Sequence, residues 1–281
     1  GMGSVVLADV PAGTVVVGEG EEGEIPHLYI GETIGARGTG APVELAVDPI
    51  EGSTLCAKAL PNALAVIAVA EPGSFLKVPD IYMDKIAIGP GFEDGLVDLD
   101  ASPKENLERL AKAKGVKLSE ITACILDRPR HGRLIEAVRK AGAAIRLIGD
   151  GDIAGVIHTT EPQDTGIDIY MGVGGAPEGV LAAAALCRIG GHMQARLMAA
   201  NEEQRERAAA AGIKEFERKY SIPDMVSGEV KFAATGITDG SLLEGVRFTN
   251  GMISTHTVTM RSQPRTTRWI HTEHRDMSKF A

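Results

Sequence analysis

Short apolar runs, separated by glycines and charged turns, dominate the first hundred residues. Four of these runs are rich in small or β-branched residues and are flanked by turn residues, a pattern that predicts strands. The expected strands are Thr14–Val17, Val43–Val47, Ala63–Ala70 and Lys85–Ile88. All the apolar runs are far shorter than the ~20 residues that a membrane helix needs. We therefore expect no membrane-spanning segment.

From Ser102 onward, helical and strand patterns alternate. Ser102-Pro103-Lys104-Glu105 has the capping-box pattern of a helix start, and Gly142 is placed to end a later helix. Strand–helix–strand repeats at this spacing predict an α/β fold with parallel strand pairs. The expected elements are a helix after Ser102, strands Ile121–Leu126, Ala144–Ile148 and Ile167–Met171, helices Arg133–Lys140, Ile153–His158 and Pro177–Arg188, a charged helix Asn201–Tyr220, and further strands within Gly228–Trp269. The change of pattern places a domain boundary at residue 100, between 1–100 and 101–281.

The charge balance restricts the partners. With 29 Lys and Arg against 38 Asp and Glu, the net charge is −9, so nucleic acid and anionic membranes are not expected to bind. Cys56, Cys124 and Cys187 form no CxxC pair and lie in apolar stretches, as expected for small buried residues of a reducing compartment. The sequence therefore predicts a cytoplasmic protein without a zinc site.

The sharpest chemical signal is Asp48-Pro49-Ile50-Glu51-Gly52-Ser53, which follows an apolar strand. Its two carboxylates can converge on one metal ion, and oxygen ligands alone select Mg²⁺ or Mn²⁺ over Zn²⁺. Gly52 and Ser53 are expected to begin a helix through Leu60, whose N-terminus favours an anion. A plain Asp-Pro turn followed by a helix cap is the alternative.

Two glycine loops have part of the dinucleotide-binding pattern and fail it. Gly18–Glu24 is followed by Pro26 rather than by a helix, and its glutamates would repel a pyrophosphate. Those glutamates, Glu19 among them, suit a hard cation, or they are acidic turn residues in water. In the second loop Pro177 takes the third glycine position, and Glu178 falls in the first helical turn. Glu178 is either a third metal carboxylate or a residue that complements the helix dipole.

Polar residues also follow later strands. Arg128 and Arg130 come after Leu126, where arginines at a strand's carboxyl end suit phosphate recognition. Asp150–Asp152 follow the next strand and could accept hydrogen bonds from sugar hydroxyls, and Tyr82 could form a wall against a sugar. Each motif has a plainer alternative. The two arginines could be ordinary surface residues, Asp150–Asp152 could be an N-cap with its turn, and Tyr82 could lie at the edge of the core.

Together these motifs resemble the class II fructose-1,6-bisphosphatases, some of whose members also cleave sedoheptulose 1,7-bisphosphate. The resemblance runs from about Thr14 to about His274. It rests on these stretches in family order: VVVGEGE, LYIGE, AVDPIEGS, NALAV, YMDKIAIGPG, ILDRPRH, DGD, GVGGAPEGV and FAATGITDGSLLEGV. DPIEGS alone would indicate only the wider lithium-sensitive sugar-phosphatase superfamily. The resemblance implies a layered α/β/α/β/α sugar-phosphatase fold.

The resemblance also implies a role for each matched position. Glu19 matches a ligand of one metal ion, while Asp48, Glu51 and Glu178 match ligands of a neighbouring ion, Mn²⁺ or Mg²⁺. The positions that match substrate contacts are Glu51, Gly52, Ser53, Tyr82, Arg128, Pro129, Arg130, Asp150, Gly151, Asp152 and Gly175. Residues 1–100 would then bind metal and phosphate, and 101–281 would bind the substrate.

The implied reaction is hydrolysis of the 1-phosphate of fructose 1,6-bisphosphate to fructose 6-phosphate, as in gluconeogenesis. Glu51 and Ser53 would be the catalytic residues, with the Ser53 hydroxyl positioning the attacking water. There are two alternatives. The protein could carry out the same chemistry on sedoheptulose 1,7-bisphosphate or an inositol phosphate, or it could be a catalytically silent subunit that binds a sugar phosphate. The family also suggests a homo-oligomer.

Two features depart from the family pattern. Family members carry a few dozen residues before GEGE, including helices and an aspartate that binds the first metal, whereas only Gly1–Pro11 precede Ala12 here. Either the N-terminal helices are missing, in which case the first metal ion loses one ligand, or that segment is only absent from this numbering. Ser53 stands where the family commonly has threonine, which keeps the hydroxyl and removes a methyl group. We expect a moderate effect on positioning.

Overall fold

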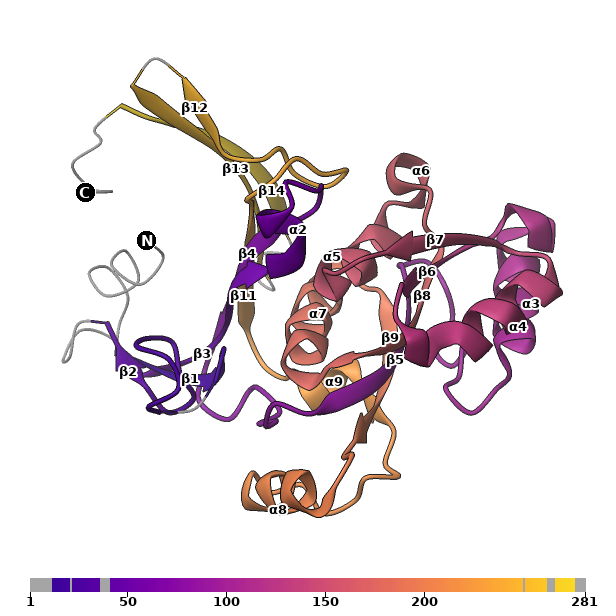
Figure 1. Ribbon diagram of the computed structural model, residues 1–281, viewed down its shortest axis with the longest axis horizontal. Coiled ribbons are helices and arrows are strands. Elements are labelled where there is room, and N and C mark those ends of the chain that lie inside the picture. The colour runs from indigo at the N-terminus through magenta and orange to yellow at the C-terminus, as the bar shows by residue number, and fades with distance from the viewer. Residues whose placement is uncertain (1–11, 21, 36–40, 250, 262–265, 276–281) are drawn as a thin grey trace. The chain divides into compact units, whose positions relative to one another are not determined.

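The chain divides into two compact units, each built on one mixed β-sheet (Figure 1). The computed structural model describes residues 12–20, 22–35, 41–249, 251–261 and 266–275. One unit comprises 1–77 and 226–281, and the other comprises 78–225. The sequence boundary at residue 100 falls within the second unit. The alternatives for the N-terminal helices concern residues 1–11, which lie outside the described residues.

The sheet of the first unit combines strands from both ends of the chain. Its order is β12-β13-β11-β4-β3-β1-β2, with β14 paired to β13. β1 and β3 are parallel, and the other pairs are antiparallel. The strands are β1 (Gly13–Val17), β2 (Thr33–Ile34), β3 (Val43–Glu51), β4 (Leu64–Ala70), β11 (Val230–Gly236), β12 (Arg247–Thr249), β13 (Met252–Arg261) and β14 (Thr266–His274).

Alternation along β1 and β3 builds the core of the first unit. Val15, Leu45 and Val47 are buried together with Leu28 and Ile34, which come from the connection between β1 and β3. A Cβ at Gly18 would collide with the Leu28 carbonyl, so only glycine lets this connection pass so close to β1. The GEGE segment is thereby fixed to the end of β1 by backbone packing.

Helix α2 (Ser53–Ala57) follows β3 directly. The expected start at Ser53 is confirmed, but the expected extension to Leu60 is wrong. Ala59 and Asn62 adopt positive φ angles of 52° and 77°, and Pro61 between them cannot continue a helix. The chain therefore leaves the helix early and turns into β4.

The second unit has the sheet order β10-β9-β5-β8-β6-β7. β6 is parallel to both β7 and β8, whereas β5 is antiparallel to its neighbours β8 and β9. The strands are β5 (Tyr82–Ile88), β6 (Thr122–Leu126), β7 (Ala144–Ile148), β8 (Ile169–Gly175), β9 (His192–Met198) and β10 (Tyr220–Ser221). The parallel pairing expected from the strand–helix–strand spacing is confirmed.

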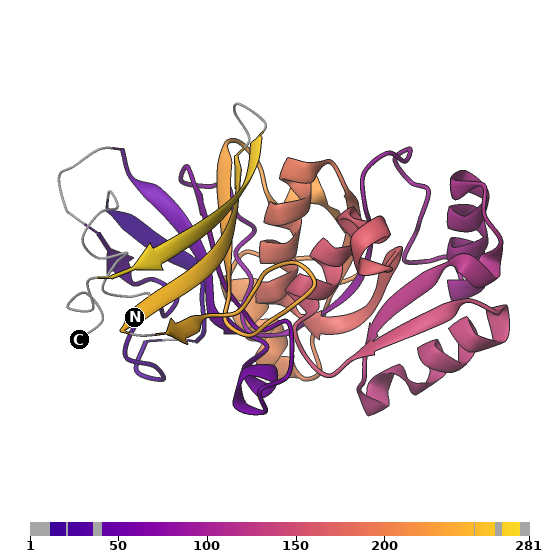
Figure 2. The same cartoon turned by 90° about the horizontal axis from the view of Figure 1, so that it is seen from above.

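Helices cover both faces of the second sheet (Figures 1 and 2). α3 and α4 pack on one face through Leu107, Leu110 and Val138, and α5 and α7 pack on the other. The helices are α3 (Pro103–Lys114), α4 (Gly132–Ala141), α5 (Asp152–Ile157), α6 (Pro162–Thr165), α7 (Ala176–Ile189), α8 (Glu202–Ala210) and α9 (Ile222–Met225). The α/β class predicted from the sequence is confirmed, and the two mixed sheets with their helices are consistent with a layered sugar-phosphatase fold.

Local end signals explain where these helices begin and end. The capping box expected at Ser102 is present: the Ser102 side chain accepts a hydrogen bond from Glu105 N, and the Glu105 carboxylate accepts one from Ser102 N. Gly142 ends α4 with a φ of 93°. The single helix expected over Asn201–Tyr220 is wrong, because Gly212 has a φ of 92° and α8 ends at Ala210.

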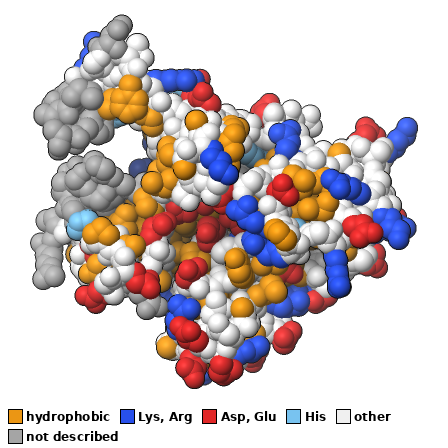
Figure 3. All heavy atoms as spheres, viewed as in Figure 1, with side chains coloured by type: hydrophobic (Ala, Val, Ile, Leu, Met, Phe, Trp, Pro, Cys, Tyr) orange, Lys and Arg blue, Asp and Glu red, His pale blue; other side chains and the backbone are white. Residues whose placement is uncertain are grey.

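Among the helices of the described residues, none combines the length and apolar character that crossing a membrane requires. On the face of the molecule drawn in Figure 3, basic side chains are scattered, and acidic side chains are partly scattered and partly gathered near the centre. On helix α3, Lys104 lies 3.6 Å from Glu108. Such i,i+4 pairs are typical of a solvated helix face.

Candidate functional site

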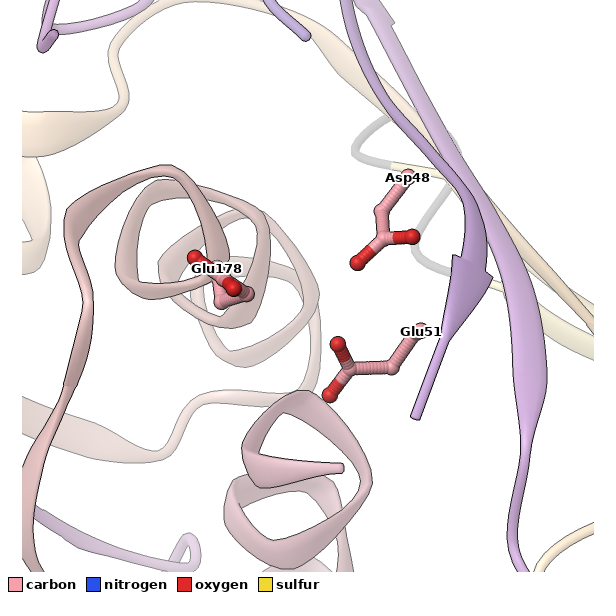
Figure 4. Close-up of side chains that lie close together, drawn as sticks. All are labelled: Asp48, Glu51 and Glu178. Atoms are coloured by element: carbon pink, nitrogen blue, oxygen red, sulfur yellow. The ribbon is translucent and has the colours of Figure 1, made fainter. Parts of the chain in front are cut away.

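A β-bulge places Asp48 and Glu51 on the same face of β3. In a regular strand, residues three apart point to opposite faces. Here Asp48 pairs with Val66 and Glu51 pairs with Leu64, so the register shifts by one residue between them. Their carboxylate oxygens lie within 4.8 Å of one another, and Figure 4 shows both side chains leaving β3 on the same side. This geometry suits one divalent cation.

The backbone around the bulge holds these carboxylates in place. Asp48 Oδ1 accepts a hydrogen bond of 3.0 Å from Ile50 N, which fixes the aspartate over its own turn. Gly52 follows Glu51 with a φ of 78° and caps α2. This positive φ favours glycine, and a Cβ at Gly52, 3.0 Å from Leu55 Cδ1, would also require the leucine side chain to shift.

Ser53 is the first residue of α2, and its side chain is exposed. The first N–H groups of a helix have no partner inside the helix. Gly52 and Ser53 therefore place main-chain donors and a hydroxyl directly after the Asp48–Glu51 pair. This is the carboxylate-and-donor combination that the sequence predicts for a phosphate bound beside a metal.

Glu19 lies two residues beyond the end of β1, and its side chain is exposed. Because β1 and β3 are parallel, with Val17 paired to Ala46, Glu19 and Asp48 follow the same edge of the sheet. The Glu19 carboxylate does not join Asp48 and Glu51 within 4.8 Å. Its acidic neighbour Glu21 lies outside the described residues.

In the second unit, the predicted substrate residues gather at one edge of the sheet. β6, β7 and β8 are parallel, so their carboxyl ends meet at a common edge. Arg128–Arg130 and Asp150–Asp152 follow β6 and β7, Gly175 is the last residue of β8, and Glu178 lies in the first turn of the helix that follows it. Tyr82 begins the antiparallel β5 and pairs with Gly175 at the same edge. The structure thus brings together four of the sequence motifs.

Arg130 is anchored to the end of β8. Its Nε and Nη2 atoms donate hydrogen bonds of 3.0 and 2.8 Å to the Val173 carbonyl, and its guanidinium lies 4.7 Å from the centre of the Tyr82 ring. The cation–π contact and the two hydrogen bonds fix the planar group. Arg128 lies 3.6 Å from Asp150 and donates to the Gly149 carbonyl, which links the loops after β6 and β7.

His131 connects the Arg128–Arg130 segment to β8. It follows Pro129 and Arg130 in a short 3₁₀ turn, and it is 2% exposed. Its Nδ1 lies 2.7 Å from the Leu126 carbonyl, and its Nε2 accepts a 2.8 Å hydrogen bond from Val173 N. The histidine pKa is lowered, mainly by burial and in part by the nearby Arg130, which favours this neutral ring.

The Asp150-Gly151-Asp152 turn presents its two aspartates differently. Asp150 is partly exposed beside Arg128, whereas Asp152 is 5% exposed and is the first residue of α5. Oδ2 of Asp152 accepts hydrogen bonds from Lys85 Nζ and, at 3.4 Å, from Tyr170 Oη. Gly151, with a φ of 82°, makes the turn between them. Of the two carboxylates, that of Asp150 is therefore better placed to meet a sugar hydroxyl.

Glu178, labelled in Figure 4, stands in the first turn of α7. Its carboxylate folds back over Gly175. A Cβ at Gly175 would collide with the Glu178 carboxylate, so the glycine makes room for it. Burial, together with the nearby Asp152 carboxylate, raises the pKa of Glu178 to about 7, while Lys85 opposes that shift. A cation bound by this carboxylate would shift its pKa down.

Sequence reasoning missed the role of two residues in this region. Lys85 was assigned only to an apolar strand, although it is 1% exposed and paired with Asp152. The signal was a lysine in the otherwise apolar end of Tyr82–Ile88, since lysine is almost never fully buried unless it is paired. His131 was noticed inside its motif, but the sequence alone does not show that Val173 is its partner.

Comparison with known proteins identifies the family. The model of the bacterial fructose-1,6-bisphosphatases, described as glpX-encoded, matches residues 4–274. The chain therefore belongs to this family, whose named members are phosphoric monoester hydrolases. It is 44% identical over 276 residues to fructose-1,6-bisphosphatase 1 class 2 of Escherichia coli K12, covering 93% of this chain and 81% of the relative. The class 2 fructose-1,6-bisphosphatases of Escherichia coli O6:H1 and Shigella flexneri match with the same figures.

Proposed function

We propose that this protein hydrolyses the 1-phosphate of fructose 1,6-bisphosphate and releases fructose 6-phosphate and inorganic phosphate. The observation that carries the proposal is the bulge in β3, which turns Asp48 and Glu51 to one face immediately before a helix N-terminus. The named activity of the relatives supports this reaction. It does not favour sedoheptulose bisphosphate, an inositol phosphate or a silent binding subunit.

The reaction requires a divalent cation, Mg²⁺ or Mn²⁺, for which we propose Asp48, Glu51 and Glu178 as ligands and Glu19 as a ligand of a second ion. The paired oxygens of Asp48 and Glu51 fit a hard cation. When bound, such an ion supplies Lewis acidity, neutralising phosphoryl oxygens and lowering the pKa of a water molecule. The absence of histidine and cysteine from this set argues against zinc.

Around the reacting phosphate we assign roles to Glu51, Gly52 and Ser53. The N–H groups of Gly52 and Ser53 would hold the phosphoryl oxygens, and they cost no reorganisation because the glycine cap fixes them. The Ser53 hydroxyl would accept a hydrogen bond from the attacking water, or donate one to it, and so orient the water for in-line displacement. Glu51 and Ser53 are therefore the catalytic residues of the proposal.

For the sugar and its second phosphate we propose the sheet edge of the second unit. Arg130, fixed by Val173 and Tyr82, offers a guanidinium to an anionic oxygen, and Pro129 stiffens the approach to it. Arg128 and Asp150 lie side by side and could exchange their mutual contact for phosphate and hydroxyl groups. Gly151, Asp152 and Gly175 complete the proposed contacts through the backbone of their loops.

The test is phosphate release from fructose 1,6-bisphosphate with Mg²⁺ or Mn²⁺, with a chelator control and with sedoheptulose 1,7-bisphosphate and an inositol phosphate as competing substrates. Glu51→Gln should abolish turnover while circular dichroism shows the fold unchanged. Glu136→Gln, on the exposed side of α4 away from the β6 end, is the matched control and should retain activity. Wild-type turnover in Glu51→Gln would refute the metal assignment.

The family's homo-oligomeric state, a cytoplasmic location, a place in gluconeogenesis and membership of the lithium-sensitive superfamily stay predictions. Each has a direct test. Light scattering on the purified chain gives the oligomeric state. Titration of the phosphatase activity with LiCl, using KCl as the control, tests the superfamily assignment.

A further inference from the structure

Lys85 is a fully buried lysine at the substrate edge of the second sheet. Its side chain is 1% exposed and lies on β5, three residues after Tyr82. Removing an ammonium group from water costs several kcal/mol, and proteins recover that cost only with well-placed partners. The placement of Lys85 therefore calls for a reason beyond core packing.

The partners of Lys85 come from two different substrate loops. Nζ donates to Oδ2 of Asp152, at the start of α5, and donates a 2.8 Å hydrogen bond to the carbonyl of Gly175, at the end of β8. Tyr170 Oη approaches the same Asp152 oxygen at 3.4 Å. One ammonium group thus joins the turn after β7 to the turn after β8.

The surrounding glycines leave room for this ammonium group. A Cβ at Gly174 would collide with Asp152 Oδ2 and would lie 2.9 Å from Lys85 Nζ. A Cβ at Gly179, on α7, would lie 3.3 Å from Lys85 Cδ. Strand β8 therefore approaches the Lys85–Asp152 pair more closely than a residue with a side chain would allow, whereas on α7 the glycine chiefly makes room for Met83 Sδ, which would lie 2.3 Å from a Cβ at Gly179.

Another lysine–aspartate pair in the same unit has similar chemistry in a different place. Lys114, the last residue of α3, pairs with Asp168, which is 7% exposed and precedes β8. Asp168 also accepts a 2.8 Å hydrogen bond from Thr122 N at the start of β6. This pair ties the start of β6 to the start of β8, at the end of the strands opposite the substrate motifs. It is a natural control for a purely structural ion pair.

We propose that Lys85 is a positioning residue, which sets the spacing between the Asp150–Asp152 turn and the Gly175 turn so that both reach one sugar phosphate. The inference rests on the proposed function for its substrate. The lysine acts through Asp152 and Gly175 rather than by touching the substrate. Its removal should therefore affect substrate binding more than the chemical step.

The experiment compares Lys85→Met with Lys114→Met in the full chain, because methionine keeps the length of lysine and removes its charge. Each variant is assayed for KM and kcat with fructose 1,6-bisphosphate, and its melting temperature is recorded. Lys85→Met should raise KM about tenfold or more, equivalent to ~1.4 kcal/mol, with a smaller change in kcat. Lys114→Met should lower the melting temperature and leave KM unchanged.

Gly174→Ala covers the case in which Lys85→Met does not fold, because it displaces the pair without removing a charge. Amide hydrogen exchange of 149–152 and 174–178 gives a readout that is independent of turnover. Exchange should quicken in both Lys85→Met and Gly174→Ala and stay unchanged in Lys114→Met.

The outcomes separate the two proposals. If the wild-type chain shows no turnover, the proposed function fails, and the exchange comparison still decides the role of Lys85. A KM within about twofold of wild type in a folded Lys85→Met, or equal exchange in the Lys85 and Lys114 variants, would overturn the positioning role. An equal rise in KM in both lysine variants would also overturn the positioning role, because it would show a general effect of stability instead.

Discussion

The His131 ring gives a direct way to test how the arginine loop is held. A backbone N–H only donates, so the 2.8 Å contact from Val173 N requires an unprotonated Nε2. Nδ1 therefore carries the proton and donates it to the Leu126 carbonyl at 2.7 Å. The Val173 carbonyl also accepts both hydrogen bonds from Arg130, so one residue of β8 holds the loop through its N–H and its carbonyl.

We expect His131→Leu to destabilise the second unit by about 1–3 kcal/mol, the cost of leaving one buried polar group unpaired. The variant removes the partner of Val173 N, whereas the Leu126 carbonyl keeps its 2.9 Å hydrogen bond from Arg128 N. Hydrogen exchange of the β6 and β8 amides measures this loss within the unit itself. The loosened loop should also raise KM for fructose 1,6-bisphosphate.

Val138→Ala is the control for this variant, because it removes buried volume from α4 and breaks no hydrogen bond of the loop. It should lower stability and leave KM unchanged. A His131→Leu variant that is within 0.5 kcal/mol of wild type, on the scale of an ordinary surface substitution, would refute the reasoning.

The same contact predicts a pH dependence with a definite sign. Burial lowers the pKa of His131 below its ordinary value of 6.5, so the neutral ring is favoured in the folded state. Its stabilisation is complete above pH 6.5 and is lost as the pH falls from there through the folded-state value. His158, whose pKa burial lowers to about 4, adds a loss of the same sign. The stability difference between wild type and His131→Leu should therefore shrink on acidification, and a constant difference would contradict the assignment.

Three further substitutions have clear expected outcomes. Arg130→Lys should raise KM several-fold with little change in kcat, because an ammonium cannot make both hydrogen bonds to Val173 and the contact with Tyr82. Unchanged steady-state kinetics would argue against this anchor. Gly52→Ala should lower kcat and destabilise the first unit by about 1–2 kcal/mol, since the φ of Gly52 is 78°. Urea denaturation measures the stability and a turnover assay measures kcat, and a neutral result in both would remove the glycine cap from the proposal. Ser102→Ala should cost about 0.5–2 kcal/mol through loss of the capping box, with KM unchanged; a shift in KM would mean that α3 contributes to the substrate edge.

Local signals predicted most of the elements in both units. The Ser102 capping box, the Gly142 terminus and the strand Ala144–Ile148 were predicted because each depends on residues close in sequence. The helix over Asn201–Tyr220 was overestimated, since charged residues continue past Gly212 while the backbone does not stay helical.

The pairing partners of strands could not be predicted in the same way. β11 lies beside β4, and its Val230 pairs with Ala70, which no local pattern reveals. The pattern around residue 100 reflects a change in element type, whereas the units reflect which strands share a sheet. Burial of Lys85 is a further case, because its partner Asp152 lies far along the chain.

The candidate site shows how one register irregularity changes the chemistry of a strand. The sequence pattern predicts a strand that stops at Val47 and a turn that brings Asp48 and Glu51 together. In the structure the strand continues to Glu51, and a regular strand would then point the two carboxylates to opposite faces. The bulge restores their convergence, so the backbone, not the spacing alone, creates the pair.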